Sequence, residues 1–277
     1  PQPGRAVMAK AAIHLTPVTL ELGGKSPAIV APDFALDQAA ERLLWAKLLN
    51  AGQICTNVDY LLLPEGREQA FIEHAQRIAA ARFPNLLNGD YTAIIDQRQY
   101  DRLQAMLQDA QAQGATLIPM LPGQAGDAAR RILPPVLVLN ATPAMQVLQR
   151  EIFGPILPIL TYRSHEEVVQ YINARQHPLA LYIYSHDKAV QDFYLHHTLS
   201  GGVSINDSLI HTGLHNLPFG GVGHSGMGHY HGYEGFLTFS KLRPVFQQSR
   251  WRTVDLLMPP YGKRAYQLLK FMFWRNR

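Results

Sequence analysis

A single cysteine, Cys55, is the residue of this sequence best suited to covalent chemistry. It is one cysteine among 277 residues, so no disulfide can form within the chain, which fits a reducing compartment. Cys55 follows Gly52-Gln53-Ile54, and a glycine-led turn after a helix can expose a side chain and leave its backbone N–H free. Such a thiol could attack a carbonyl while the N–H receives the developing oxyanion. The alternative is an inert, buried cysteine.

Two carboxylates stand in unusual settings. Leucines flank Glu21 and two glycines follow it, and an apolar setting raises a carboxyl pKa into the range of a general base. The alternative is a surface glutamate paired with Lys25. Glu151 opens the run Glu-Ile-Phe-Gly-Pro, where its carboxylate could accept two hydroxyl hydrogen bonds from a ribose. The alternative is a turn acid before a strand.

Twelve histidines raise the question of a metal site. His211 and His215 are four positions apart, and His229 and His231 are two apart. Neither pair belongs to a His-Glu-x-x-His motif, and the glycine-rich surroundings fix no geometry between them. We therefore predict no metal.

Strand and helix patterns alternate along the chain. Apolar periodicity, with Gly52 and Gly114 ending two helices and Ser164 with Glu167 forming a capping box, predicts an α/β fold with a largely parallel sheet. Gly4, ahead of a helical run, resembles the tail of a phosphate-binding loop. The predicted strands or apolar runs are 27–30, 58–63, 115–118, 136–139, 156–162, 179–184 and 203–206, and the predicted helices include 37–49, 69–83, 97–113 and 187–197.

The chain changes character after Asn206. Residues 218–235 are dense in glycine but include Phe219 and Tyr230, which favours a loop threaded past a ligand over a free linker. Residues 256–277 mix basic and aromatic side chains. Such a helix can lie on a membrane surface, although we favour a terminal helix packed on the protein body or on a partner subunit.

Composition excludes several classes of protein. Hydrophobic residues make up 47% and charged residues 17%, and the net charge is +4, values typical of a globular chain. No basic stripe with interleaved aromatics indicates nucleic acid. No apolar run is long enough for a membrane-spanning helix, and the start shows no signal peptide.

Four motifs together resemble the aldehyde dehydrogenase superfamily. The run LELGGKSP around Glu21 resembles its glutamate signature, GQIC ending at Cys55 its cysteine signature, EIFGP at Glu151 its cofactor-ribose motif, and PFGG around Phe219 its late active-site loop. Their order and spacing also match. Asn206-Asp207, His211 and Gly-His-Tyr-His-Gly at 228–232 resemble the class 3 branch, and Pro-Pro-Tyr-Gly at 259–262 resembles bacterial members acting on coniferyl-type aldehydes.

The resemblance implies a mechanism. The Cys55 thiolate adds to an aldehyde to give a thiohemiacetal, whose oxyanion is held partly by the N–H of Cys55. Hydride passes to the nicotinamide of NAD or NADP, and Glu21 activates the water that releases a carboxylic acid from the thioester. The implied cofactor-binding residues are Glu151, Phe153, Leu22, Gly23 and Gly4, and the implied substrate-pocket residues are Phe219, His211 and Asn206.

The resemblance also implies an organisation. Residues 1–21 would be a remnant of the NAD(P)-binding domain, 22–221 the catalytic domain, and 222–277 an active-site return loop, an oligomerisation strand and a C-terminal helix. Family members are dimers or tetramers with roughly another domain upstream, and we expect this protein to be cytoplasmic. We therefore expect a carboxy-terminal fragment of a homodimeric enzyme, with little or no activity alone.

Two alternative functions stay open. The chain could be a non-catalytic remnant that packs or oligomerises through the family's segments. It could also belong to a CoA-acylating member, in which a thiol resolves the thioester. Glu21 argues against the second alternative, because such members often lack the base that activates water.

Overall fold

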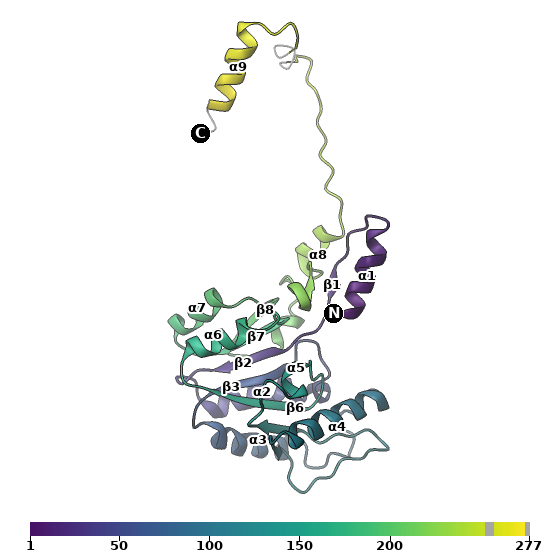
Figure 1. The fold of residues 1–277 in the computed structure, drawn as a ribbon, viewed down its shortest axis with the longest axis vertical. Coiled ribbons are helices and arrows are strands. Elements are labelled where there is room, and N and C mark those ends of the chain that lie inside the picture. The colour runs from purple at the N-terminus through teal and green to yellow at the C-terminus, as the bar shows by residue number, and fades with distance from the viewer. Residues whose placement is uncertain (253–257, 275–277) are drawn as a thin grey trace. The chain divides into compact units, whose positions relative to one another are not determined.

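A computed structural model describes residues 1–252 and 258–274 of the chain (Figure 1). The chain forms two compact units, Pro1–Phe239 and Ser240–Arg277. No α-helix in the described ranges combines the length and the apolar character that crossing a membrane requires.

The first unit is built on a seven-stranded sheet. The strand order is β4-β5-β6-β3-β2-β7-β8, and every neighbouring pair is parallel except β4 with β5. The predicted α/β fold with a largely parallel sheet is therefore confirmed. The strands are β2 (Ser26–Val30), β3 (Val58–Pro64), β4 (Thr116–Pro119), β5 (Val136–Leu139), β6 (Ile156–Tyr162), β7 (Ala180–Tyr184) and β8 (Gly202–Ile205).

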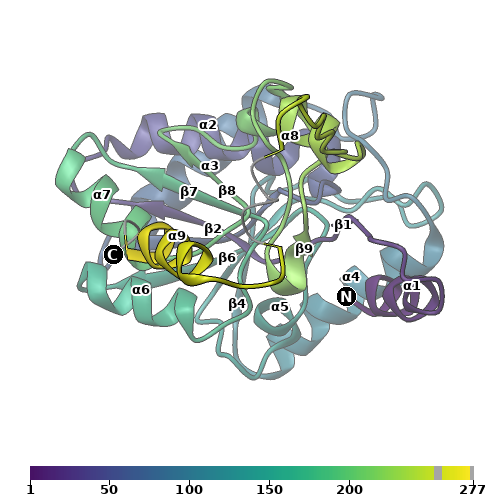
Figure 2. The same ribbon diagram turned by 90° about the horizontal axis from the view of Figure 1, so that it is seen from above.

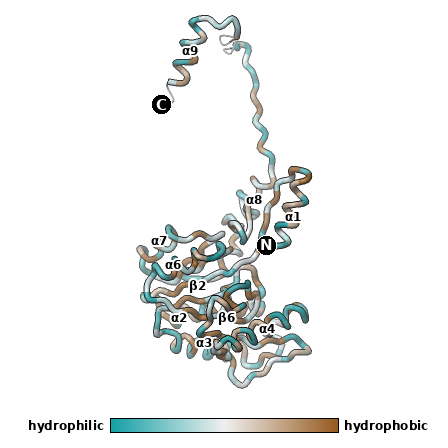
Figure 3. Tube along the Cα trace, viewed as in Figure 1, coloured by the Kyte–Doolittle hydropathy of each residue, from teal (hydrophilic) through white to brown (hydrophobic). Residues whose placement is uncertain are grey.

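Helices cover both faces of this sheet. Helices α2 and α3 lie against one face, and α6 and α7 lie against the other (Figures 1 and 2). The central strands therefore consist mostly of buried apolar residues, although β2 begins with Ser26 and β3 contains Asp59. Figure 3 colours the chain by hydropathy. The helices are α1 (Gln2–Ala12), α2 (Leu36–Leu48), α3 (Glu68–Arg82), α4 (Gln97–Ala112), α5 (Gln146–Gln149), α6 (His165–Asn173), α7 (Lys188–His197) and α8 (Gly232–Thr238).

The amino ends of three adjacent strands carry the predicted reactive residues. Glu21 lies in the segment before β2, Cys55 in the segment before β3, and Glu151 in the segment before β6. Because β6, β3 and β2 are neighbours and parallel, their amino ends meet at one edge of the sheet. Ligands of open α/β sheets usually bind at the carboxyl ends of the strands, so this edge is the less usual one.

A short second sheet ties the glycine-rich return to the segment that carries Glu21. Strand β1 (Leu20–Glu21) pairs antiparallel with β9 (Gly226–Met227). The N–H of Leu22 also donates to the carbonyl oxygen of Ser225 at 3.1 Å. Both strands have two residues, too short for a periodic pattern, and the sequence did not predict them.

The second unit contains helix α9 (Lys263–Trp274). Residues 240–252 form neither helix nor strand. Residues 253–257 and 275–277, which include parts of the predicted tail, lie outside the described residues. The oligomerisation strand and the three predicted domains stay predictions.

Candidate active site

Cys55 lies in a turn whose position is set by the conformation of the backbone before it. Helix α2 ends at Leu48, and the next residues include three consecutive ones with positive φ, Asn50, Ala51 and Gly52. The helix thus ends before Gly52, which belongs to the following turn. The N–H of Asn57 then donates to the carbonyl oxygen of Ile54 at 2.9 Å. This bond closes a turn around Cys55 whose own hydrogen-bond pattern does not use the N–H of Cys55.

The thiol of Cys55 and the carboxylate of Glu21 are hydrogen-bonded to one another. Burial, the negative charge of Glu21 and this bond raise the pKa of the Cys55 thiol to about 12, against a small opposing effect of the Thr56 N–H. Desolvation raises the pKa of Glu21. At neutral pH the sulfur therefore holds a proton, and the carboxyl group of Glu21 lies beside it. The alternative pairing of Glu21 with Lys25 is wrong, because Lys25 pairs with Asp59.

Glu151 lies over the two glycines that follow Glu21. A Cβ on Gly23 would stand 2.0 Å from Oε2 of Glu151, and the N–H of Gly24 donates to the same carboxylate. Burial and the charge of Asp59 raise the pKa of Glu151 to about 7, although Gly24, Lys25 and a nearby arginine oppose them.

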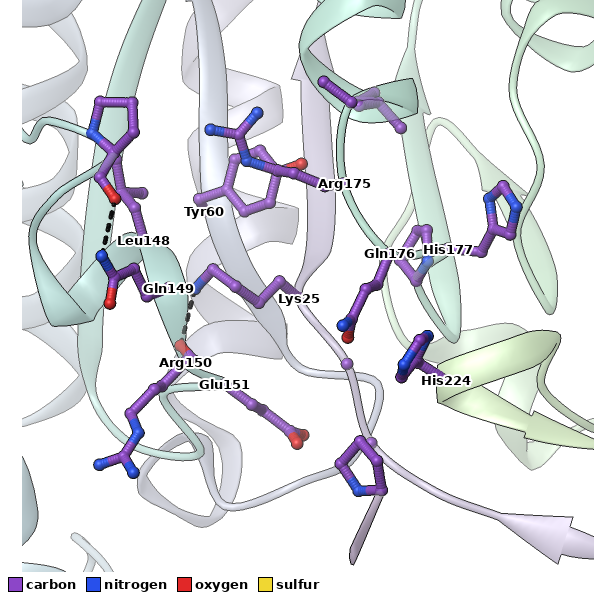
Figure 4. A pocket seen from close by; sticks show the side chains of 17 residues that line it. Lys25, Tyr60, Leu148, Gln149, Arg150, Glu151, Arg175, Gln176, His177 and His224 are labelled. Atoms are coloured by element: carbon purple, nitrogen blue, oxygen red, sulfur yellow. Dashed lines mark hydrogen bonds between the residues drawn. The ribbon is translucent and has the colours of Figure 1, made fainter. Parts of the chain in front are cut away.

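A cavity of about 780 Å³ lies beside this carboxylate. Glu151, Gly23, Lys25 and Pro1 are among the residues that line it (Figure 4). Gly4, near the start of α1, lies against Leu22, since a Cβ there would be 3.1 Å from that side chain. The predicted cofactor-binding residues Gly4, Leu22, Gly23 and Glu151 are therefore close neighbours.

Phe153 follows Glu151 in a strained loop. Its φ is 47° and its exposed fraction is 38%. The guanidinium of Arg102 holds the loop by donating to the carbonyl oxygens of Ile152 at 2.7 Å and Glu151 at 3.4 Å. Both Glu151 and Phe153 line a second hollow, of about 570 Å³.

An aromatic cluster lies next to the thiol and carboxylate. Phe219 is 6% exposed. Its ring centroid lies 5.6 Å from that of Tyr230, edge to face, and 5.1 Å from that of His231, stacked. The charges of Glu21 and a deprotonated Cys55 contribute to raising the pKa of Tyr230, after desolvation. Tyr230 thus lies beside the reacting pair, although the sequence placed it only in the glycine-rich stretch 218–235 and in the run that resembles the class 3 branch.

The side chain of Tyr182 lies between His211 and the turn that carries Cys55. Its ring lies 5.9 Å from that of Tyr182, whose hydroxyl donates to the carbonyl oxygen of Thr56. Among the described residues, neither ring nitrogen of His211 has a hydrogen-bond partner, and burial lowers its pKa. A buried neutral imidazole with unused nitrogens suits the wall of a pocket.

Asn206 has a structural use in the contacts described. Its side-chain oxygen accepts from the N–H of Ser185 at 2.8 Å, and its backbone carbonyl accepts from Arg42. It has a φ of 59° and follows β8, at the end of the sheet opposite to Cys55. These contacts give no support to the predicted pocket role, which stays a prediction.

The residues around Glu151 fit the ribose of a nicotinamide nucleotide. A half-buried carboxylate with two acceptor oxygens suits a pair of sugar hydroxyls, and side-chain-free Gly23 lets a ligand or the carboxylate approach the backbone. Among residues 1–252 and 258–274 no group of three or more His, Cys, Asp or Glu could hold a metal ion.

Comparison with known proteins gives consistent similarities. Residues 1–245 match the model of the aldehyde dehydrogenase family. A probable coniferyl aldehyde dehydrogenase of Pseudomonas aeruginosa is 49% identical over 98% of this chain and 56% of its own length. A dimeric, NADP-preferring aldehyde dehydrogenase of Canis lupus familiaris is 41% identical over 87% of this chain and 52% of its own.

A solved structure, the substrate-bound state of Staphylococcus aureus AldH, is similar with a TM-score of 0.89 and 36% identity. It matches 98% of this chain and 58% of its own. The chain therefore spans little more than half the length of these relatives.

Proposed function

Because the chain belongs to the aldehyde dehydrogenase family, we propose that it carries the nucleophile and the base of an enzyme that oxidises an aldehyde to a carboxylic acid with NAD or NADP. The observation that carries the proposal is the placement of the Cys55 thiol beside the Glu21 carboxylate, where each group affects the pKa of the other. A nucleophile beside its base is the arrangement that covalent catalysis requires.

Addition to the aldehyde begins with a proton transfer. Glu21 accepts the thiol proton as the sulfur of Cys55 bonds to the carbonyl carbon, and the carbonyl electron pair moves onto oxygen. The N–H of Cys55, unused by its turn, donates to this oxyanion. We infer that a second oxyanion donor comes from the part of the full-length relatives that this chain does not span.

The cofactor would be held by Glu151 and the Gly23-Gly24 backbone, with Phe153 bordering the ring. When bound, the oxidised nicotinamide supplies the hydride acceptor that leaves a thioester on Cys55. Glu21 first releases the thiol proton to solvent and then takes a proton from water as the oxygen adds to the thioester carbon. When the C–S bond breaks, the acid is released and the sulfur takes that proton back from Glu21. The raised pKa of Glu21 suits both proton transfers.

For the substrate we propose an aromatic aldehyde of the coniferyl type. The names of two similar Pseudomonas proteins support this choice. So does the cluster of Phe219, Tyr230 and His231 beside the reacting pair, because aromatic rings favour stacked and edge-to-face contacts with another ring. We further propose that the whole protein is a cytoplasmic homodimer, in keeping with its single free cysteine and with the dimeric relative.

The test is acid formation from such an aldehyde by the protein at the length of its relatives. We expect Cys55→Ser to abolish the acid, and Glu21→Gln to leave a thioester that hydroxylamine releases. Acid production by Cys55→Ser would contradict the proposal. An acyl-CoA product formed only with added CoA would instead favour the CoA-acylating alternative.

We expect the 277-residue chain alone to oxidise aldehydes poorly or not at all. Loss of one oxyanion donor alone costs about 10²–10³ in rate. Robust oxidation by this chain would contradict that expectation. If the alkylation rate of the Cys55 thiol did not depend on Glu21, that result would favour the non-catalytic remnant.

A further inference from the structure

Asp59 is a buried carboxylate that the proposed chemistry does not use. It is the second residue of β3 and is 3% exposed. Its Oδ1 accepts from the N–H of Ile152 at 2.8 Å, and its Oδ2 forms an ion pair with Lys25. A single side chain therefore joins β3 to two segments that are distant in sequence.

Lys25 completes this junction from the other side. Besides its bond to Asp59, its Nζ donates to the carbonyl oxygens of Val147 at 2.8 Å and Arg150 at 2.9 Å. Figure 4 shows the lysine reaching the backbone of Arg150. All three ammonium hydrogens thus have acceptors, and the side chain is 15% exposed.

Each segment that meets here also carries one of the reacting groups. Cys55 lies four residues before Asp59, Glu21 lies four residues before Lys25, and Glu151 directly precedes Ile152. The junction lies beneath the edge of the sheet where β2, β3 and β6 begin. A shift of any one segment at this point would move its reacting group against the other two.

We propose that the Asp59–Lys25 ion pair is a positioning device that fixes Cys55, Glu21 and Glu151 relative to one another. The roles of those three residues rest on the proposed function, but their relative placement does not. Buried ion pairs add little stability compared with apolar substitutes. Holding the three groups in fixed positions therefore explains this ion pair better than a contribution to stability does.

The experiment measures alkylation of Cys55 by iodoacetamide across pH in the 277-residue chain. Cys55 is the one cysteine, so the reaction reports on this site alone. We expect Asp59→Asn to separate the thiol from Glu21 and to speed alkylation at about pH 8 by about fivefold or more, with the profile moved toward that of an ordinary thiol.

Two further variants separate positioning from folding. Lys25→Met combined with Asp59→Asn removes both charges of the pair together, and we expect it to show the same faster alkylation with a folded circular dichroism spectrum. In a Glu21→Gln background, Asp59→Asn should add nothing, because its effect passes through the separation of thiol and carboxylate. Glu65→Gln, which removes the exposed ion pair with Arg163, is the matched control and should change nothing.

A folded double variant with the wild-type alkylation profile would overturn the proposal, even if its melting temperature fell. Failure of the double variant to fold would also overturn it, since the pair would then serve the fold itself. Alkylation needs neither aldehyde nor cofactor, so absence of aldehyde oxidation would count against the proposed function and leave this result standing.

Discussion

Gly52 and Gly154 lie backbone against backbone. A Cβ on Gly52 would stand 2.3 Å from the carbonyl oxygen of Gly154 and 3.2 Å from that of Lys47. Gly52 leads the turn that carries Cys55, and Gly154 ends the loop that carries Glu151. The nucleophile turn and the cofactor loop therefore meet at a point with no room for a side chain.

Substitution of Gly52 by alanine should be among the most damaging single changes in the chain. Gly52→Ala combines a strained φ of +77° with the close contact, whereas Gly66→Ala has a φ of +86° with nothing within 4 Å. The left-handed conformation costs roughly 1–2 kcal/mol in each variant. We expect Gly52→Ala to lose at least about 2 kcal/mol more, measured by urea unfolding. Equal losses would show that the contact relaxes freely.

Gly23→Ala, unlike Gly52→Ala, should cost little stability but should change the pKa of a neighbouring group. The atom that its Cβ would meet is the end of the Glu151 side chain, which can swing away, so we expect less than about 1 kcal/mol of destabilisation. The displaced carboxyl should leave its buried site, and its pKa of about 7 should fall toward the ordinary value near 4.3. Carbon-detected NMR titration of labelled glutamates, assigned with Glu151→Gln, measures this.

Gly213→Ala is the control for that change, because nothing lies within 4 Å of its Cβ and its φ is not in the left-handed region. The Glu151 titration should stay near pH 7 in this variant. An unchanged titration in Gly23→Ala as well would mean that Glu151 does not depend on the space over Gly23.

Lys47 gives a signature in the pH dependence of stability. It is 1% exposed, its Nζ donates to the carbonyl oxygen of Val58 at 2.8 Å, and burial lowers its pKa to about 7. An unfolded lysine has a pKa near 10.4. Between these values the unfolded chain binds more protons, so the contribution of Lys47 to the free energy of unfolding rises with pH.

We therefore expect the stability of the wild type, relative to Lys47→Met, to rise by roughly 1 kcal/mol per pH unit between about pH 7.5 and 9. Urea unfolding at several pH values measures the difference. Lys10→Met, on an exposed position of α1, should give a curve parallel to that of the wild type. A parallel curve for Lys47→Met would refute the assignment.

Much of the sheet was predictable because its strands are apolar runs bounded by turn residues. The runs 136–139 and 156–162 were predicted with the bounds that β5 and β6 have. Their spatial order was not predictable, because neither periodicity nor turn chemistry says that β3 lies between β6 and β2. That order brings Cys55, Glu21 and Glu151 to one edge.

The residues of the candidate site that belong to sequence motifs could be predicted. Those that depend on contacts between residues far apart in the sequence could not. Glu21 beside Lys25 in sequence suggested a local ion pair, yet Lys25 reaches across 34 residues to Asp59. Tyr230 follows β9, whose pairing with β1 joins the glycine-rich return to the segment of Glu21, and two-residue strands leave no sequence signal. Asn206 has a left-handed backbone and a bond to Ser185, and only coordinates reveal such a structural use.

The response of the Cys55 thiol to loss of the Glu21 carboxylate tests the account most directly. The charge and hydrogen bond of Glu21 raise the thiol pKa, so Glu21→Gln should lower it and increase the thiolate fraction. We predict alkylation by iodoacetamide at about pH 8 to be about tenfold faster than in the wild type. Glu41→Gln, which removes a remote carboxylate paired with Arg82, should leave the rate unchanged. A Glu21→Gln rate equal to that of the wild type would contradict the pairing of thiol and base.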